Sequence, residues 1–168
     1  TFLTDDSHSP ADWNAAPPCD PLMYGLTLAV PNDAERAAVV LTEPKPTGPV
    51  LAELVRVRDD QNVSVSFTLK APQAVHIYAI GEGVNNRMAD YAWIEDASGA
   101  KVWTMEMKDT YHAGGARKNR LADLRLTLAK GTYTLHYRTD SSHAYGDWNS
   151  DAPTDTERYG ATVRSITE

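Results

Sequence analysis

The sequence predicts an all-β fold, an antiparallel β-sandwich of about eight strands in a jelly-roll-like arrangement. Apolar and polar residues alternate with a period of two in several short runs, as they do in strands that bury one face. Turn-forming residues, mainly Gly, Asn and Asp, separate these runs. Short strands at such close spacing are typical of sandwiches and barrels.

The elements before the sandwich are expected in the N-terminal third of the chain. Residues 1–30 should contain a hairpin segment. Residues 31–49 should hold a short helix, over 32–40, because good N-capping residues precede strong helix formers there. A linker rich in proline follows in the same segment and favours an extended connection. The complete sandwich is therefore expected over residues 50–168.

The strands of the sandwich are assigned from the alternation. Residues 63–69, VSVSFTL, alternate without a break and give the clearest strand. Turns are expected between the strands, including one in the glycine-containing stretch 81–87. The other strands are predicted over residues 54–58, 75–80, 91–95, 102–107, 124–128, 133–138 and 159–163.

A polar stretch occurs twice, as DDSHSPADWN at residues 5–14 and as DSSHAYGDWN at residues 140–149. Adding 135 to the residue number aligns residues 4–27 with residues 139–162 without a gap, and half of the aligned positions are identical. In the first copy the identical residues are Thr4, Asp5, Ser7, His8, Asp12, Trp13, Asn14, Pro18, Asp20, Tyr24, Gly25 and Thr27.

This repeat predicts the domain organisation. Residues 1–30 are interpreted as the C-terminal loop and last strand of a preceding, related domain, so that the chain comes from a tandem array. The alternative is that residues 1–30 form an integral hairpin of a single fold.

The second copy lies in a loop of about 20 residues, longer than most connections, and long loops often carry function. Four of its residues offer the hard oxygen ligands that Ca²⁺ prefers, namely Asp140, Asp147, Asn149 and Asp155. The alternative is a purely structural loop without a cofactor, in which Asp and Asn side chains form local turns. Zinc is disfavoured because the loop holds a single His and no Cys.

A basic stretch at residues 111–120 is the second candidate. It would bind an anionic or sugar ligand, or it would pair with the acidic loop at 140–155, so that the two loops form one surface. The predicted ligand-binding residues of the two loops are His112, Arg117, Lys118, Asn119, His143 and Trp148.

Catalysis has little support, and no catalytic residue is predicted. Ser142 and His143 are neighbours in the sequence, and neighbouring side chains of an extended loop diverge, so they do not form a nucleophile and its base. Carboxylates such as Asp140 and Glu82 would serve a hydrolase only at a suitable separation in space.

Composition excludes several classes of partner. A formal net charge of −7 disfavours binding to nucleic acid. The apolar runs fall far short of the roughly 18 residues of a transmembrane helix, so no membrane span is expected. The single cysteine, Cys19, cannot form an internal disulfide.

Residues 126–137, LTLAKGTYTLHY, resemble the segment of strand, Ala-Gly turn and Tyr-bearing strand in pre-peptidase C-terminal domains and related bacterial jelly-roll accessory modules. The resemblance implies a non-catalytic secreted or periplasmic module attached to a larger protein.

The expected function is therefore that of a non-catalytic accessory module in a multidomain bacterial protein, located outside the cytoplasm. Its partners would be neighbouring domains of the same polypeptide and a glycan or protein ligand at the loop end of the sandwich. The alternatives are a hydrolase that uses carboxylates or His of the same loops, and a purely structural spacer.

Overall fold

The computed structural model describes residues 48–166 and, before them, residues 8–9, 12–17, 19, 24–26 and 29. The chain divides into two compact units, Thr1–Lys45 and Pro46–Glu168. The helix predicted over residues 32–40 lies outside the described residues, and so does most of the linker that follows it.

The described part of the first unit contains one antiparallel pair, β1 (His8–Ser9) and β2 (Asp12–Trp13). In this pair His8 lies opposite Trp13, and Ser9 lies opposite Asp12.

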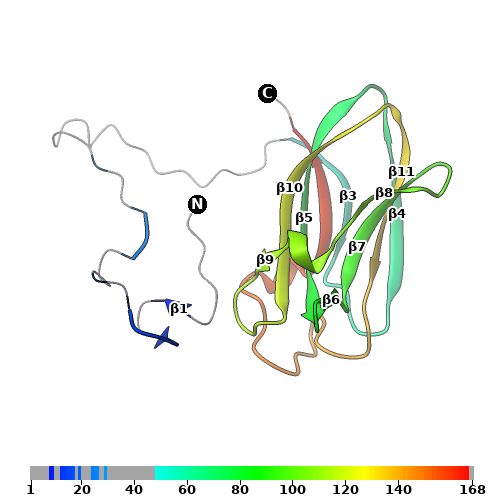
Figure 1. Ribbon diagram of the computed structural model, residues 1–168. Helices are drawn as coiled ribbons and strands as arrows, with labels where there is room; N and C mark the ends of the chain where they lie inside the picture. Colours follow the sequence, from blue (N-terminus) through cyan, green and yellow to red (C-terminus); the bar gives the residue numbers. More distant parts are fainter. Residues whose placement is uncertain are drawn as a thin grey trace. The chain divides into compact units, whose positions relative to one another are not determined.

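The second unit is an all-β sandwich of two antiparallel sheets (Figure 1). The first sheet has the order β3 (Val50–Val55), β12 (Gly160–Ser165), β5 (Gln73–Val84), β10 (Asn119–Leu128) and β9 (Tyr111–His112), with β6 (Arg87–Met88) paired to β5. The second sheet has the order β4 (Asn62–Leu69), β11 (Gly131–Arg138), β7 (Tyr91–Asp96) and β8 (Lys101–Thr104).

The core lies between the two sheets. β11 and the first half of β5 bury alternate side chains, as the period of two predicts, whereas β12 buries nearly all of its residues. From the first sheet Val75, Ile77 and Val163 are fully buried, and from the second sheet Ile94 and Leu135 meet them. The burial of these apolar side chains is the main source of the stability of the sandwich.

Several strand boundaries differ from the prediction. The first strand ends at Val55, earlier than expected, because Arg56 has a φ of 56° and leaves the extended conformation. The predicted turn at 81–87 is shorter than expected, since β5 continues to Val84 and only Asn85 and Asn86 take positive φ values. The strand predicted over 102–107 ends at Thr104.

Two short 3₁₀ helices lie in the connections between strands of the sandwich. η2 (Met107–Asp109) comes after β8, and η3 (Thr156–Arg158) precedes β12. In the part of the chain that the structure describes, no helix is long and apolar enough to cross a membrane.

Four connections gather at one end of the sandwich, which we call the loop end. They are residues 56–61, 85–90, 113–118 and 139–159, and the last of these is drawn in orange in Figure 1. This end carries the two stretches that the sequence singles out in the second unit, the acidic loop at residues 140–155 and the basic loop at residues 111–120.

Candidate functional site at the loop end

Backbone hydrogen bonds join the loops of the loop end into one surface. The N–H of Asp60 donates to the carbonyl of Asp140 at 2.7 Å. On the other side of the long loop, the N–H of Ala116 donates to Asp151 at 3.1 Å and the N–H of Thr154 donates to Ala113 at 2.9 Å. The basic loop and the acidic loop therefore lie against each other, as one of the two sequence interpretations requires.

Two fully buried side chains, Asn119 and His143, connect the basic loop and the acidic loop through hydrogen bonds. Asn119 Nδ2 donates to the carbonyls of Gly114 at 2.7 Å and Asp151 at 2.9 Å. Its Oδ1 lies 2.6 Å from His143 Nε2, which must be the donor because the amide oxygen only accepts. Burial lowers the pKa of His143, so the ring is neutral.

Trp148 covers the buried histidine. Its ring meets the His143 ring edge-on at 5.1 Å and the Tyr159 ring at 5.0 Å and 83°. Tyr159 is fully buried, whereas Trp148 is half-buried. Trp148 therefore packs as a plug over one end of the core, which is the structural role that the sequence allowed for it.

The described residues of the first copy of the repeat share two contacts with the second copy. The rings of Trp13 and Tyr24, the residues that align with Trp148 and Tyr159, meet edge-on at 5.1 Å and 86°. The pairing of Ser9 with Asp12 also recurs, as an antiparallel bridge between Ala144 and Asp147. The repeated residues thus specify a small folding motif in both units.

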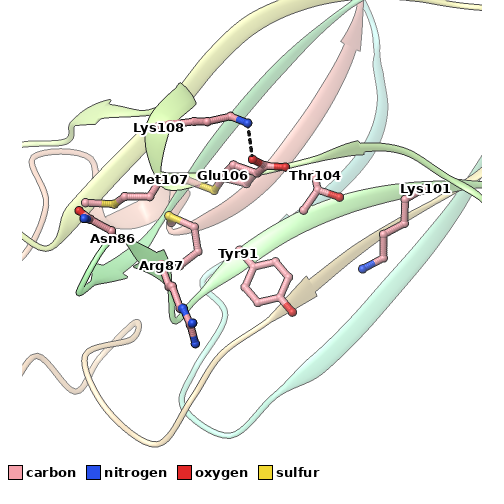
Figure 2. A pocket seen from close by; sticks show the side chains of 10 residues that line it. Asn86, Arg87, Tyr91, Lys101, Thr104, Glu106, Met107 and Lys108 are labelled. Carbon is pink, nitrogen blue, oxygen red and sulfur yellow. Dashed lines mark ion pairs between the residues drawn. The ribbon is translucent and has the colours of Figure 1, made fainter.

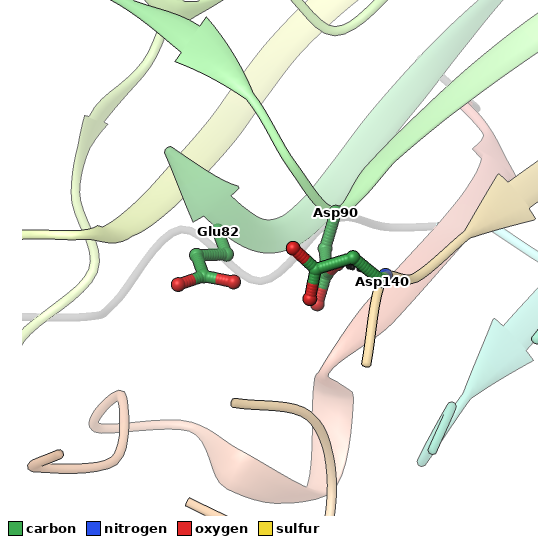
Figure 3. A group of neighbouring side chains, drawn as sticks. All are labelled: Glu82, Asp90 and Asp140. Carbon is green, nitrogen blue, oxygen red and sulfur yellow. Dashed lines mark hydrogen bonds between the residues drawn. The ribbon is translucent and has the colours of Figure 1, made fainter. Parts of the chain in front are cut away.

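Three carboxylates converge beneath these loops (Figure 3). Glu82 lies near the end of β5, Asp90 immediately before β7 and Asp140 just after β11. One carboxylate oxygen from each residue lies within 4.8 Å of those from the other two. Glu82 is 3% exposed and Asp90 is 0% exposed, whereas Asp140 is exposed.

Asp90 is held on both carboxylate oxygens. The Tyr159 hydroxyl donates to Oδ2 at 2.5 Å, and the Asp140 N–H donates to Oδ1 at 2.7 Å. Burial nevertheless raises the pKa of Asp90 to about 7, with Asp140 and Glu82 adding to the rise. Asp90 thus ties β7 to the last strand and to the start of the long loop.

Glu82 has one partner and one open oxygen. Lys118 Nζ lies 2.9 Å from Glu82 Oε1 and also donates to Asn149 Oδ1. Glu82 Oε2 is buried and has no hydrogen-bond partner in the described part of the chain. Burial raises the pKa of Glu82, and the ion pair with Lys118 opposes this rise only in part.

More acidic groups surround this cluster on the outside. Asp59 is half-buried and accepts a hydrogen bond from the Ala144 N–H at 3.0 Å. Burial raises the pKa of Asp59, and the charges of Asp147, Asp60 and Asp140 raise it further. The surroundings of the carboxylate cluster are therefore rich in negative charge, and the Lys118 ammonium lies beside Glu82 within them.

The four predicted metal ligands do not form one set in the described structure. Asp140 joins the carboxylate cluster, Asp147 lies in the outer acidic group and Asn149 accepts from Lys118. Asp155 lies elsewhere, where it accepts from the Tyr78 hydroxyl at 3.3 Å. Asp155 lies just before η3, whereas Asp140 lies just after β11.

The predicted ligand-binding residues also divide. Asn119, His143 and Trp148 hold the loops together, and the first two have no exposed surface to offer a ligand. His112 Nε2 donates to the Ala116 carbonyl at 3.2 Å inside the basic loop. Arg117 is exposed and Lys118 faces the acidic cluster.

Asp90 is not among the site residues that the sequence predicts, and Glu82 is among them only as one carboxylate of a hydrolase pair. Neither residue lies in a sequence motif. The fold of the strands brings both of them close to Asp140 at one end of the sandwich. A charged residue at the end of a mostly apolar strand, as Glu82 is in QAVHIYAIGEGV, was the available signal.

No protein-family model matches this chain, and no curated protein matches it.

Proposed function

We propose that residues 48–166 form a non-catalytic accessory module of a larger multidomain bacterial protein, and that its loop end binds Ca²⁺ and, through it, a glycan or protein ligand. A location outside the cytoplasm, as in the accessory modules that residues 126–137 resemble, is part of this proposal. The observation that carries it is the convergence of Glu82, Asp90 and Asp140, one of which keeps a buried oxygen without a partner.

The strand order supports a jelly-roll form of the module. The eight longer strands run β3-β12-β5-β10 in one sheet and β4-β11-β7-β8 in the other, and all their pairings are antiparallel. Successive strands thus alternate between the sheets over much of the chain, as they do in jelly rolls.

The local likeness of the two repeat copies supports a tandem array. Each copy has the same edge-on pair of Trp and Tyr rings and the same short antiparallel pairing. A preceding domain that ended in this way would place its last loop and strand at residues 1–30. Neighbouring domains of the same polypeptide are then the first partners of the module.

The geometry and charge of the cluster fit a hard divalent cation. Ca²⁺ takes six to eight oxygen ligands at about 2.3–2.6 Å, so ligand oxygens on opposite sides of the ion lie roughly 5 Å apart. In the cluster, one carboxylate oxygen from each residue lies within 4.8 Å of those from the other two. Three carboxylates would leave positions for water and for ligand oxygens, and the exposed Asp140 places such positions toward the surface.

Charge balance also favours a cation. Burying Glu82 and Asp90 near Asp140 and the outer Asp59 raises the pKa values of the first two and of Asp59. One ammonium, that of Lys118, faces this field at Glu82. A divalent ion would compensate the remaining repulsion between the carboxylates. A loop that served only as a spacer would have no need to keep these carboxylates together.

A hydrolytic function fits this geometry less well. A carboxylate pair must reach the scissile bond of its substrate, but Asp90 is 0% exposed and both of its oxygens are already hydrogen-bonded. His143 is buried and points its Nε2 at Asn119. A binding module is therefore the better account of the loop end.

The test is thermal unfolding of the full chain after EDTA treatment and after addition of Ca²⁺. Binding to the folded state must raise the melting temperature by mass action. We expect a rise with Ca²⁺ in the wild type, a loss of the rise in Asp140→Asn, and a larger rise in Lys118→Gln, because the ammonium competes with the ion for Glu82.

Asp109→Asn is the matched control, since Asp109 is an exposed acid in η2 outside the cluster and should leave the response unchanged. A wild-type melting temperature that does not respond to Ca²⁺ would overturn the cation site. The buried carboxylates would then be a structural network, and the module a spacer.

A further inference from the structure

A second surface of the sandwich, whose lining includes none of the three carboxylates of the cluster, has the features of a ligand site. An open cleft of about 390 Å³ lies where β6, β7 and β8 meet the segment that leads into η2 (Figure 2). Its volume falls in the range of small-molecule sites, about 300–1,000 Å³. The lining combines cations, one aromatic ring and methionines.

Three cations line the cleft, in a protein whose net charge is −7. Lys108 Nζ pairs with Glu106 Oε2 at 2.8 Å. Arg87 and Lys101 have no carboxylate partner in the part of the chain that the structure describes, and both are exposed. The cleft therefore keeps two cationic groups for an anionic ligand.

The aromatic ring in the cleft, Tyr91, begins a row of rings on the outer face of the second sheet. Tyr91 and Trp93 alternate with the buried Ala92 and Ile94, so both project outward. Their centroids are 5.5 Å apart. The row continues to His136 on the neighbouring strand, whose ring stacks on Trp93 at 4.7 Å and 3°.

This row is fixed in place before any ligand binds. Trp93 Nε1 donates to Glu95 Oε1 at 2.8 Å, and His136 covers one face of the indole. Lys101 Nζ lies 5.1 Å from the Trp93 centroid, as a cation–π contact that holds the ammonium beside the cleft. A site built on strands and fixed by such contacts loses little entropy on binding.

Methionines supply the apolar part of the lining of the cleft. Met88, Met105 and Met107 line it, which is three of the four methionines in the sequence. Methionine side chains adjust to irregular shapes without losing contact. The cleft thus offers a ring and an apolar wall to one part of a ligand and two cations to another.

We propose that this cleft binds an acidic sugar, one pyranose of which lies against Tyr91 while its carboxylate or sulfate group pairs with Arg87 and Lys101. Aromatic rings pack against the C–H face of a sugar, and arginine pairs with carboxylates in a planar, bidentate fashion. The protein's net charge of −7 disfavours a nucleic acid, whose phosphates run the length of the polymer. The site needs none of the three carboxylates at the loop end.

The experiment is a titration of the full chain with hexagalacturonate, followed by tryptophan fluorescence, in buffer with EDTA. Trp93 touches both Tyr91 and Lys101, so its emission should report the binding. Because EDTA removes divalent ions, the result does not depend on the proposed calcium site. A chondroitin sulfate hexasaccharide in a parallel titration separates sulfate from carboxylate recognition.

Variants locate the site. Arg87→Gln and Lys101→Gln should each weaken binding of the preferred sugar at least about tenfold, and Tyr91→Ala should do the same while Tyr91→Phe keeps the ring and most of the affinity. Lys130→Gln, an exposed cation in the turn between β10 and β11, is the matched control and should bind as the wild type does. Unchanged melting temperatures verify that the variants are folded.

Three results would overturn the proposal. Binding of neutral maltohexaose as tight as that of the acidic sugars would remove the role of the cations. A poly-glutamate peptide that binds equally well would indicate general attraction of anions rather than sugar recognition. Absence of binding to both acidic sugars would show that the cleft does not take this class of ligand.

Discussion

At the scale of single residues, Asp90 is the centre of the loop end. It is fully buried, and it accepts hydrogen bonds from Tyr159 of the last strand segment and from the backbone of Asp140. The backbone at Asp90 packs closely against Gly81. A Cβ atom at residue 81 would lie 2.2 Å from the Asp90 carbonyl oxygen, so only glycine allows this approach. A buried carboxyl in such a place links three segments that are distant in the sequence.

Asp90 should make the stability of the metal-free protein depend on pH. Its pKa is 3.8 in the unfolded chain and about 7 in the folded protein, so between these values the folded state holds more protons. The free energy of unfolding should therefore fall as pH rises from about 4 to about 7, by up to about 4 kcal/mol. Urea unfolding in EDTA at several pH values measures this.

The comparison with Asp90→Asn isolates the effect, because Asn resembles the protonated acid and does not titrate. Glu82 and Asp59, whose pKa values are also raised, act in the same direction in both proteins. His143, whose pKa is lowered, acts in the opposite direction in both. Equal pH slopes in wild type and variant would show that Asp90 is not the group responsible.

At the scale of elements, β12 depends on close approach to its neighbours. It lies between β3 and β5, and its first residue, Gly160, has a φ of 131°. A Cβ at Gly160 would lie 2.0 Å from the carbonyl oxygen of Leu54. The glycine of the repeated Tyr-Gly pair is thus required by strand packing and by backbone conformation together.

Gly160→Ala should lower the free energy of unfolding by at least about 3 kcal/mol, because the clash is with backbone atoms that cannot move aside alone. Gly25→Ala is the matched control in the first copy of the repeat. Gly25 also has a positive φ, of 150°, but a Cβ there meets no heavy atom within 4 Å. Chemical denaturation of both variants measures the difference.

Similar losses of stability in the two glycine variants would contradict this account, since backbone conformation alone would then explain both. A large loss in Gly160→Ala alone would mean that the close approach of β3 sets the requirement for glycine.

At the scale of the whole molecule, the two compact units, Thr1–Lys45 and Pro46–Glu168, differ in what they bury. In the described part of the chain, all the buried apolar side chains lie between Ala52 and Val163. The second unit therefore holds a complete core of its own, which is the basis of independent folding.

A chain that begins at Pro46 should fold alone and melt within about 2 °C of the full chain. The reason is that the sandwich core comes from residues after this point. Differential scanning calorimetry of the two chains provides the comparison. A fall of more than about 4 °C would favour the alternative in which residues 1–30 are an integral part of one fold.

Much of the fold followed from the sequence by itself. Alternation of period two located strands such as β4 and β11, because side chains of a strand alternate between the core and the solvent whatever the strand pairs with. Numerical alignment of the chain with itself located the repeat, and the pair of Trp and Tyr rings recurs because nearby residues suffice to specify it.

Only the tertiary structure decided the sites. Glu82 lies near the end of β5, Asp90 just before β7 and Asp140 just after β11, and the three meet because these strand ends lie at the same end of the sandwich. Asp155 belongs to the same loop as Asp140, but its carboxylate accepts a hydrogen bond from Tyr78 of β5 and is not part of the cluster. Alternation reports which face a residue takes, but it carries no information about which strand will lie beside it.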